Sequence, residues 1–368
     1  MINQNGRVCR PDICERSREM TKKRVLLGLS GGTDSTYAAE RLMRDGYEVE
    51  GAVLRMHDFT DVSAAQRSAR ELGIPLHVID CSEAFRSAVI ENFLDEYVSA
   101  RTPNPCTVCN SEVKLRFLCE YAREHGFDRI ATGHYARVVE VPTEGGKRYA
   151  VARARDGAKD QTYMLWRLSQ EQLSMLLLPL SDIKKEDVRR ELGRIGSSAA
   201  DRSDSQEICF IPDGKYAAFV EKHRGIAQKG SFVDREGNLL GIHEGIINYT
   251  VGQRKGLGIS LGTRAFVIDI DAGSNTVTLG PEPKMSSEVH VSDMVFSGMK
   301  RPESITEAEL FVKLRYQAPP VAATVTFLPD GAAHLRLCEP VKSVTPGQSA
   351  VLYDGETVVA GGVIDVAL

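Results

Sequence analysis

The chain has 368 residues, of which 42% are hydrophobic and 26% charged, a composition typical of a globular protein with two or three domains. No apolar run approaches the ~20 residues that a membrane helix needs, and residues 1–22 contain no apolar signal core. The net charge of −4 argues against a broadly basic nucleic-acid binder. We therefore expect a cytoplasmic protein with a flexible leader, residues 1–22, and no membrane segment.

The region 23–212 alternates between strand-like and helix-like patterns. Apolar runs and helical periods follow one another in the order 25–30, 35–44, 49–54, 62–72, 76–80, 83–100 and 129–132. This order predicts an α/β domain with a Rossmann-like parallel sheet, helices on both faces and ligands at the carboxyl ends of the strands.

The first strand-like run leads into residues Ser30–Ser35, with the sequence Ser-Gly-Gly-Thr-Asp-Ser. Glycines allow a sharp turn close to phosphate oxygens, and the N–H groups at a helix start favour anions. No Gly-Lys-Ser/Thr follows, so the loop is not a Walker A loop. A Gly-Gly turn with an Asp/Ser helix cap is the simpler alternative. The lysine-poor loop resembles the pyrophosphate loop of the ATP pyrophosphatases, which split ATP into AMP and pyrophosphate, and we favour this interpretation.

Eight cysteines are too few for a disulfide scaffold in a chain of this length. The helix 83–100 ends in a loop with two prolines, and Cys109 precedes a predicted helix, 112–125, capped by Asn110 or Ser111. The dipole of that helix would lower the pKa of Cys109 and make it a nucleophile. Half of a structural zinc site is the alternative, although no second pair follows at zinc-finger spacing. We expect Cys81, Cys119 and Cys338 to be inert and assign no role to Cys9 and Cys14.

The remaining chain predicts two further domains, a small central one at 213–283 and a C-terminal β-barrel at 284–368. Short strands separated by turns follow one another after residue 263, which is typical of a small barrel or sandwich. The range from Lys147 to Arg167 contains six basic and two acidic residues. Such a stretch could bind along the phosphates of a nucleic acid, but it more often forms a solvated surface.

Six motifs, in this order, resemble those of the tRNA-specific 2-thiouridylases, enzymes that thiolate the wobble uridine of certain tRNAs. The resemblance covers nearly all of the chain after Lys23. The motifs are Ser30–Ser35, Arg101–Pro105 with Cys109, Thr132–Tyr135, Lys159–Gln161, Asp204–Ile211 and Gly252–Gly258.

The resemblance implies ATP and Mg²⁺ as cofactors and tRNA as the substrate. The residues it implies for ATP are Gly28, Leu29, Ser30, Gly31, Gly32, Thr33, Asp34, Ser35, Leu54 and Gly133. Those it implies for the target base and the tRNA are Asn104, Pro105, Cys106, His134, Lys159, Asp160, Gln161, Arg315, Tyr316 and Gln348.

The resemblance also implies a mechanism in which ATP adenylates O2 of the uridine and sulfur replaces it. In the usual family route, Cys209 carries a persulfide, and Cys109 either frees that sulfur or closes a disulfide. Many family members have an aspartate where this chain has Cys106. The third cysteine favours a 4Fe-4S cluster on Cys106, Cys109 and Cys209 with one open iron, as in the other class of tRNA thiolases. The persulfide route is the alternative.

The sulfur would come from a cysteine desulfurase, a sulfur-relay protein or free sulfide. Competing functions are another enzyme with the same loop, such as an amidating synthetase or the enzyme that places lysine on a tRNA cytidine. A non-enzymatic zinc- or RNA-binding module is a further alternative, and a dithiol oxidoreductase is weaker. None of these explains both the loop and the three cysteines.

Overall fold

The computed structural model describes residues 22–143, 145–202 and 208–368. Its first domain is built on a five-stranded, all-parallel sheet in the order β3-β2-β1-β4-β7. The strands are β1 (Arg24–Gly28), β2 (Glu48–Arg55), β3 (Leu76–Asp80), β4 (Arg129–Ala131) and β7 (Leu176–Leu177). Val25, Leu26 and Leu27 of β1 are fully buried, as expected for a parallel strand that is covered on both faces. This confirms the predicted α/β sheet.

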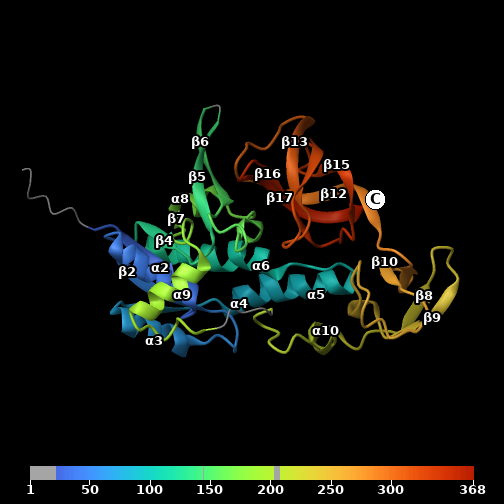
Figure 1. The fold of residues 1–368 in the computed structure, drawn as a ribbon, viewed down its shortest axis with the longest axis horizontal. Helices are drawn as coiled ribbons and strands as arrows, with labels where there is room; N and C mark the ends of the chain where they lie inside the picture. The colour runs from blue at the N-terminus through green and yellow to red at the C-terminus, as the bar shows by residue number, and fades with distance from the viewer. Residues whose placement is uncertain (1–21, 144, 203–207) are drawn as a thin grey trace, which may run out of the picture.

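The helices of this domain connect the strands and cover the sheet (Figure 1). The helix that follows β3 consists of three segments and reaches toward the central domain, where α5 packs beside α10 (Figure 1). The elements are α2 (Thr33–Arg44), α3 (Val62–Leu72), α4 (Ser82–Phe85), η1 (Arg86–Ile90), α5 (Glu91–Val98), α6 (Pro105–Val108), η2 (Cys109–Leu115), α7 (Arg116–Glu124), η3 (Thr162–Met164), α8 (Gln170–Met175) and α9 (Lys185–Arg194).

The central domain is a four-stranded sheet in the order β10-β11-β8-β9, preceded by one helix. Phe232, Val267, Val277 and Leu279 form its small core. Its elements are α10 (Tyr216–Arg224), β8 (Gly230–Val233), β9 (Leu239–His243), η4 (Ile246–Asn248), β10 (Phe266–Asp271) and β11 (Thr276–Gly280).

The C-terminal domain is a closed antiparallel barrel of six strands, because β12 pairs with both β15 and β17. This confirms the predicted barrel. The strands are β12 (Met285–Phe296), β13 (Thr306–Lys313), β14 (Val321–Phe327), β15 (Ala333–Lys342), β16 (Ser349–Asp354) and β17 (Thr357–Ala367).

A hairpin of the first domain, β5 (Ala136–Thr143) and β6 (Gly146–Arg153), extends the barrel sheet, since Ala152 of β6 pairs with Thr357 of β17. This hairpin carries the first part of the basic stretch. Arg148 donates to the carbonyl oxygens of Ser297 and Phe296, so it joins two domains. Arg148 therefore serves the domain interface, an outcome that charge counting did not predict, whereas Lys147 pairs with Glu140 within the hairpin.

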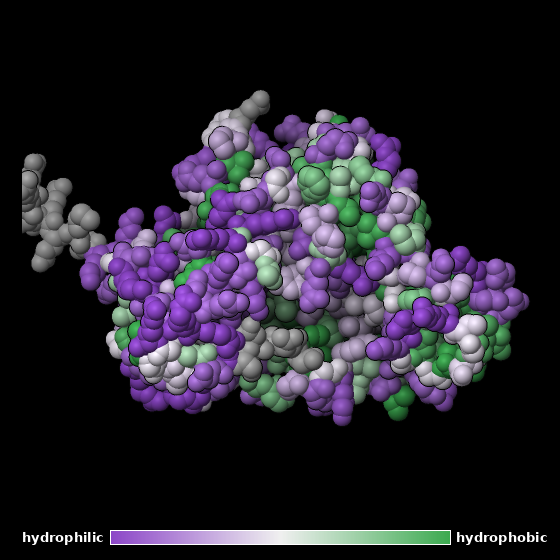
Figure 2. Space-filling model, viewed as in Figure 1, coloured by the Kyte–Doolittle hydropathy of each residue, from purple (hydrophilic) through white to green (hydrophobic). Residues whose placement is uncertain are grey.

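Polar side chains cover most of the face shown in Figure 2, and hydrophobic residues gather over the barrel and the β8–β9 end. In the part of the chain that the structure describes, no helix is long and apolar enough to cross a membrane.

Candidate functional site

A cavity of about 440 Å³ opens at the carboxyl ends of β1, β2 and β4. The order of the sheet reverses at β1, which has β2 on one side and β4 on the other, and ligands of open α/β sheets bind at such a point. The cavity is lined by Gly28, Leu29, Ser30, Asp34, Ser35, Ala52, Val53, Leu54, Met56, Thr60, Asp61, Lys114, Leu118, Thr132, Gly133, His134 and Gln161.

Two glycines allow the loop after β1 to form. Gly31 has φ +76°, and a Cβ at that position would lie 2.4 Å from the main-chain carbon of Ala64. A Cβ on Gly133 would lie 2.8 Å from the main-chain carbon of Asp34 and the amide nitrogen of Ser35. The loops after β1 and β4 therefore approach each other backbone to backbone, which only glycine permits.

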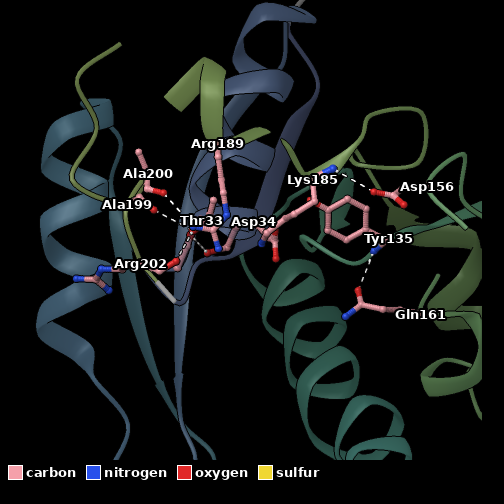
Figure 3. A network of polar contacts seen from close by, with 12 residues as sticks. Thr33, Asp34, Tyr135, Asp156, Gln161, Lys185, Arg189, Ala199, Ala200 and Arg202 are labelled. Carbon is pink, nitrogen blue, oxygen red and sulfur yellow. Dashed lines mark hydrogen bonds and ion pairs between the residues drawn. The ribbon is translucent and has the colours of Figure 1, made fainter. Parts of the chain in front are cut away.

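Hydroxyl groups hold the loop in shape from within. The amide of Ser30 donates to Oγ of Ser35 at 3.2 Å, and that hydroxyl lies 3.2 Å from the carbonyl oxygen of Gly32. Thr33 points away from the cavity, because its Oγ1 donates to the carbonyl oxygen of Ala199 at 2.9 Å (Figure 3). Gly31, Gly32 and Thr33 thus shape the loop, whereas the other residues predicted for ATP line the cavity.

Two side chains from outside the loop donate hydrogen bonds to the carboxylate of Asp34 (Figure 3). The ammonium of Lys185, at the start of α9, donates to Oδ1 at 2.6 Å, and the hydroxyl of Tyr135 donates to the same oxygen at 2.9 Å. Lys185 is 7% exposed, whereas 33% of the Asp34 side chain is exposed, so the ammonium is shielded from water but the carboxylate only partly so. The sequence analysis predicted neither α9 nor a role for Lys185, because nothing local in the sequence connects a lysine at that position with a loop about 150 residues earlier.

The position of Cys109 corrects a prediction. The helix begins at Pro105 rather than at residue 112, and Oδ1 of Asn104 caps it by accepting from the amide of Cys106 at 3.2 Å. Cys109 therefore lies inside the helical segment, away from the positive end of the dipole. It is buried, and burial raises its pKa to about 11, the opposite of the predicted direction. The exposed Cys106 occupies the first turn instead.

Cys109 adjoins the cavity through one side chain. Its Sγ lies 3.7 Å from Sδ of Met56, and Met56 lines the cavity directly after β2. Lys114 also lines the cavity, and its ammonium donates to Oδ1 of Asn110 at 3.2 Å. The strand pattern could have indicated Met56, because this residue directly follows the carboxyl end of a predicted strand. No feature of the sequence pointed to Lys114 as a cavity residue.

The three cysteines all act on the charge of one cation, Lys114. Burial works to lower the pKa of Lys114, but Cys109, Cys106 and Cys209 raise it above its ordinary value. Cys209 is exposed, and part of its motif, residues 204–207, lies outside the described residues, as do Cys9 and Cys14. Within the described ranges no three His, Cys, Asp or Glu side chains are arranged to hold a metal ion. In the described residues the three cysteines therefore do not form a ready three-ligand site for the predicted cluster.

The residues predicted for tRNA fall into two groups. His134 and Gln161 line the cavity, and Tyr316 lies close enough to Asp160 and Cys106 that, after burial, these groups raise its pKa. Burial and the charge of Lys114 lower the pKa of His134 to about 3, so this imidazole is neutral at physiological pH.

The second group has protein partners. Arg315 donates to the carbonyl oxygens of Val251 and Ser343 at 3.1 and 2.5 Å, and thereby ties the central domain to the barrel. Gln348 donates to the carbonyl oxygen of Thr102 at 2.7 Å. The buried carboxylate of Asp160 accepts from the hydroxyl of Thr162 at 2.9 Å, and Lys159 also has an interaction partner.

Three families match the chain in succession. Residues 23–213 match the family described as tRNA methyl transferase HUP domain, residues 217–281 the tRNA methyl transferase PRC-barrel domain, and residues 286–364 the aminomethyltransferase beta-barrel domain.

Curated relatives match over nearly their whole length. The chain is 41% identical over 365 residues to the tRNA-specific 2-thiouridylase MnmA of Geotalea uraniireducens, covering 94% of this chain and 96% of the relative. It is 42% identical over 362 residues to the protein of that name from Acetivibrio thermocellus, covering 94% and 100%. For the Clostridioides difficile relative the identity is 40% over 361 residues, covering 94% and 99%. The chain therefore belongs to the tRNA-specific 2-thiouridylase family.

Proposed function

We propose that this protein is an ATP-dependent tRNA uridine 2-sulfurtransferase of the cytoplasm. It adenylates O2 of the wobble uridine and replaces that oxygen by sulfur. The observation that carries the proposal is the contact between Cys109 and Met56, 3.7 Å between their sulfur atoms, because Met56 lines the cavity beside the glycine loop. The thiol of Cys109 thus lies directly behind the lining of the nucleotide cavity. An amidating synthetase does not need a thiol at this place.

The cavity would supply the first half of the reaction. The amides and hydroxyls of Ser30–Ser35 would hold the phosphates, with Leu54 and Gly133 on the adenine side. Two carboxylates line the cavity, Asp34 and Asp61, and carboxylate oxygens together with phosphate oxygens are the donors that Mg²⁺ takes. The bound Mg²⁺ would neutralise the triphosphate while O2 of the uridine attacks the α-phosphorus and pyrophosphate leaves.

Sulfur would enter through the exposed Cys209 and reach the cavity beside Cys109. An anionic sulfur is a strong nucleophile at neutral pH, and AMP is a good leaving group. In the persulfide route the terminal sulfur of Cys209 bonds to C2 as the C2–O2 bond breaks. Cys109 then attacks the inner sulfur of Cys209, which leaves the thiocarbonyl on the base, and an external thiol reductant reopens the resulting disulfide.

A 4Fe-4S cluster on Cys106, Cys109 and Cys209 remains the other candidate sulfur carrier. The exposure of Cys106 and its place near the other two thiols favour it, whereas the described arrangement forms no three-ligand site. Iron and acid-labile sulfide measured on protein purified without oxygen separate the two carriers. About four irons per chain support the cluster, and iron-free protein that is active with a persulfide donor supports Cys209.

Pyrophosphate release tests the reaction class. Purified protein is incubated with ATP and Mg²⁺, with and without bulk tRNA, and thionucleosides are measured after nuclease digestion. We expect release only with tRNA, and 2-thiouridine once a sulfur donor is added. Release without tRNA would favour an amidating synthetase, and no release at all a binding module.

A further inference from the structure

The structure places one cation between the nucleotide cavity and the cysteines. Among the described residues that line the cavity, Lys114 is the one lysine or arginine. Cys106, Cys109 and Cys209 lie close enough to this ammonium to raise its pKa against the opposing effect of burial. The positive charge of Lys114 is therefore close both to the cavity, where a nucleotide would bind, and to the cysteines, from which sulfur would arrive.

The π-helical segment η2 explains how Lys114 comes to lie near Cys109. In an α-helix, residues five positions apart point about 140° away from each other, because each residue turns the chain by ~100°. A π-helix has wider, i→i+5 turns, which bring residues five apart onto one face. Cys109 is the first residue of η2 and Lys114 its sixth. The local widening of the helix thus aligns the ammonium with the thiol.

The ammonium is held in position by the same segment. It donates to Oδ1 of Asn110 at 3.2 Å, and Nδ2 of Asn110 donates to the carbonyl oxygen of Met164 at 3.0 Å. Asn110 is buried, so both bonds are protected from water. A fixed cation in a partly desolvated site stabilises a nearby anion more strongly than a mobile surface lysine does.

We propose that Lys114 is the positioning residue of the sulfur-transfer step, which holds the anionic sulfur beside the adenylated uridine. This inference rests on the proposed function. The adenylate carries a negative phosphate, so an approaching hydrosulfide or persulfide anion is repelled unless a cation offsets the charge. With hydrosulfide, the C2–S bond forms and the C2–O bond breaks. AMP leaves with the oxygen and its electron pair, and the hydrosulfide proton replaces the one that N3 lost on adenylation.

The test separates adenylation from sulfur transfer. Lys114→Met keeps the length of the side chain and removes the charge, and Lys114→Arg keeps the charge. Both are compared with the wild type by tRNA-dependent pyrophosphate release and by 2-thiouridine formation with sodium hydrosulfide as the sulfur source. Lys229→Met, at an exposed lysine paired with Glu244 in the central domain, is the matched control. Thermal unfolding reports whether each variant is folded.

We expect Lys114→Met to release pyrophosphate within a few-fold of the wild type and to form 2-thiouridine about 100-fold more slowly, the typical effect of losing one charge-stabilising donor. Higher hydrosulfide concentrations should restore part of the rate, and Lys114→Arg most of it. Equal loss of both half-reactions in a folded variant would assign Lys114 to the nucleotide and overturn the inference. So would a Lys114→Met variant that thiolates normally. A wild type that releases no pyrophosphate with tRNA would instead overturn the proposed function.

Discussion

The ammonium of Lys185 lies 2.6 Å from Oδ1 of Asp34, although the two residues are 151 positions apart in the chain. Lys185 begins α9, and Asp34 follows the glycines of the loop after β1. The loop itself contains no lysine. The tertiary structure therefore brings to it a positive charge from a distant helix, close to where phosphates would bind (Figure 3).

Lys185→Met should destabilise the first domain and weaken ATP binding. The change leaves Asp34 with one donor fewer in a partly buried position, which costs about 1–3 kcal/mol. We expect a lower midpoint of urea unfolding and a higher Kd for ATP by calorimetry. The neighbouring Lys184 is exposed, so Lys184→Met serves as the control. An unchanged midpoint and an unchanged Kd would show that the ion pair contributes nothing to the loop.

Gly133→Ala should abolish most ATP binding while the protein remains folded. The added methyl group would lie 2.8 Å from the main chain of Asp34 and Ser35, and neither of these backbone atoms can move without shifting the loop. We expect at least a tenfold rise in the Kd for ATP. Gly193→Ala, where a Cβ meets nothing within 4 Å, should bind ATP normally and gain about 1 kcal/mol from helix propensity. Normal ATP binding by Gly133→Ala would contradict the close approach of the two loops.

His134 should make the protein less stable as the pH falls below about 6.5. Its pKa is about 3 in the folded protein and about 6.5 when unfolded, so between these values only the unfolded chain takes up the proton. The stabilisation is complete above pH 6.5 and is lost progressively toward pH 3. His134→Gln should therefore show a smaller drop in urea midpoint between pH 7 and pH 4.5 than the wild type. An equal drop in urea midpoint between pH 7 and pH 4.5 for the two proteins would refute this role of His134.

Cys106 should react with iodoacetamide much faster than Cys109. Cys106 is exposed, whereas Cys109 is buried and its pKa is raised to about 11, so little of it is thiolate at pH 8. Peptide mass spectrometry over a time course measures the two labelling rates separately. In Cys106→Ser, the labelling rate of Cys109 shows whether Cys109 reacts only after Cys106 has been modified. Equal labelling rates would show that the buried position of Cys109 does not persist in solution.

Local patterns were sufficient for much of the fold. The expected ranges 62–72 and 76–80 are the observed bounds of α3 and β3, because the periodicity and the flanking turn residues are themselves local. The β5–β6 hairpin was not predicted, although its two strands pair with each other across a short glycine turn and are therefore local. Its attachment to β17, about 200 residues further along the chain, leaves no local signal. The helix start at Pro105 was missed because two prolines suggested an extended loop, whereas proline is favoured in the first turn.

The sequence by itself determined the glycine loop, the alternation of strands and helices in the first part of the chain, and the three cysteines as candidates, because each depends on residue type and short spacing. Only the tertiary structure decided their environments. It buried Cys109 inside a helix, left Cys106 exposed, brought Lys185 to Asp34 and, through the π-helical turn, placed Lys114 between the cavity and the sulfur atoms. Burial and charge proximity arise from contacts between segments far apart in the chain, and these quantities set the pKa values and the chemistry of the site.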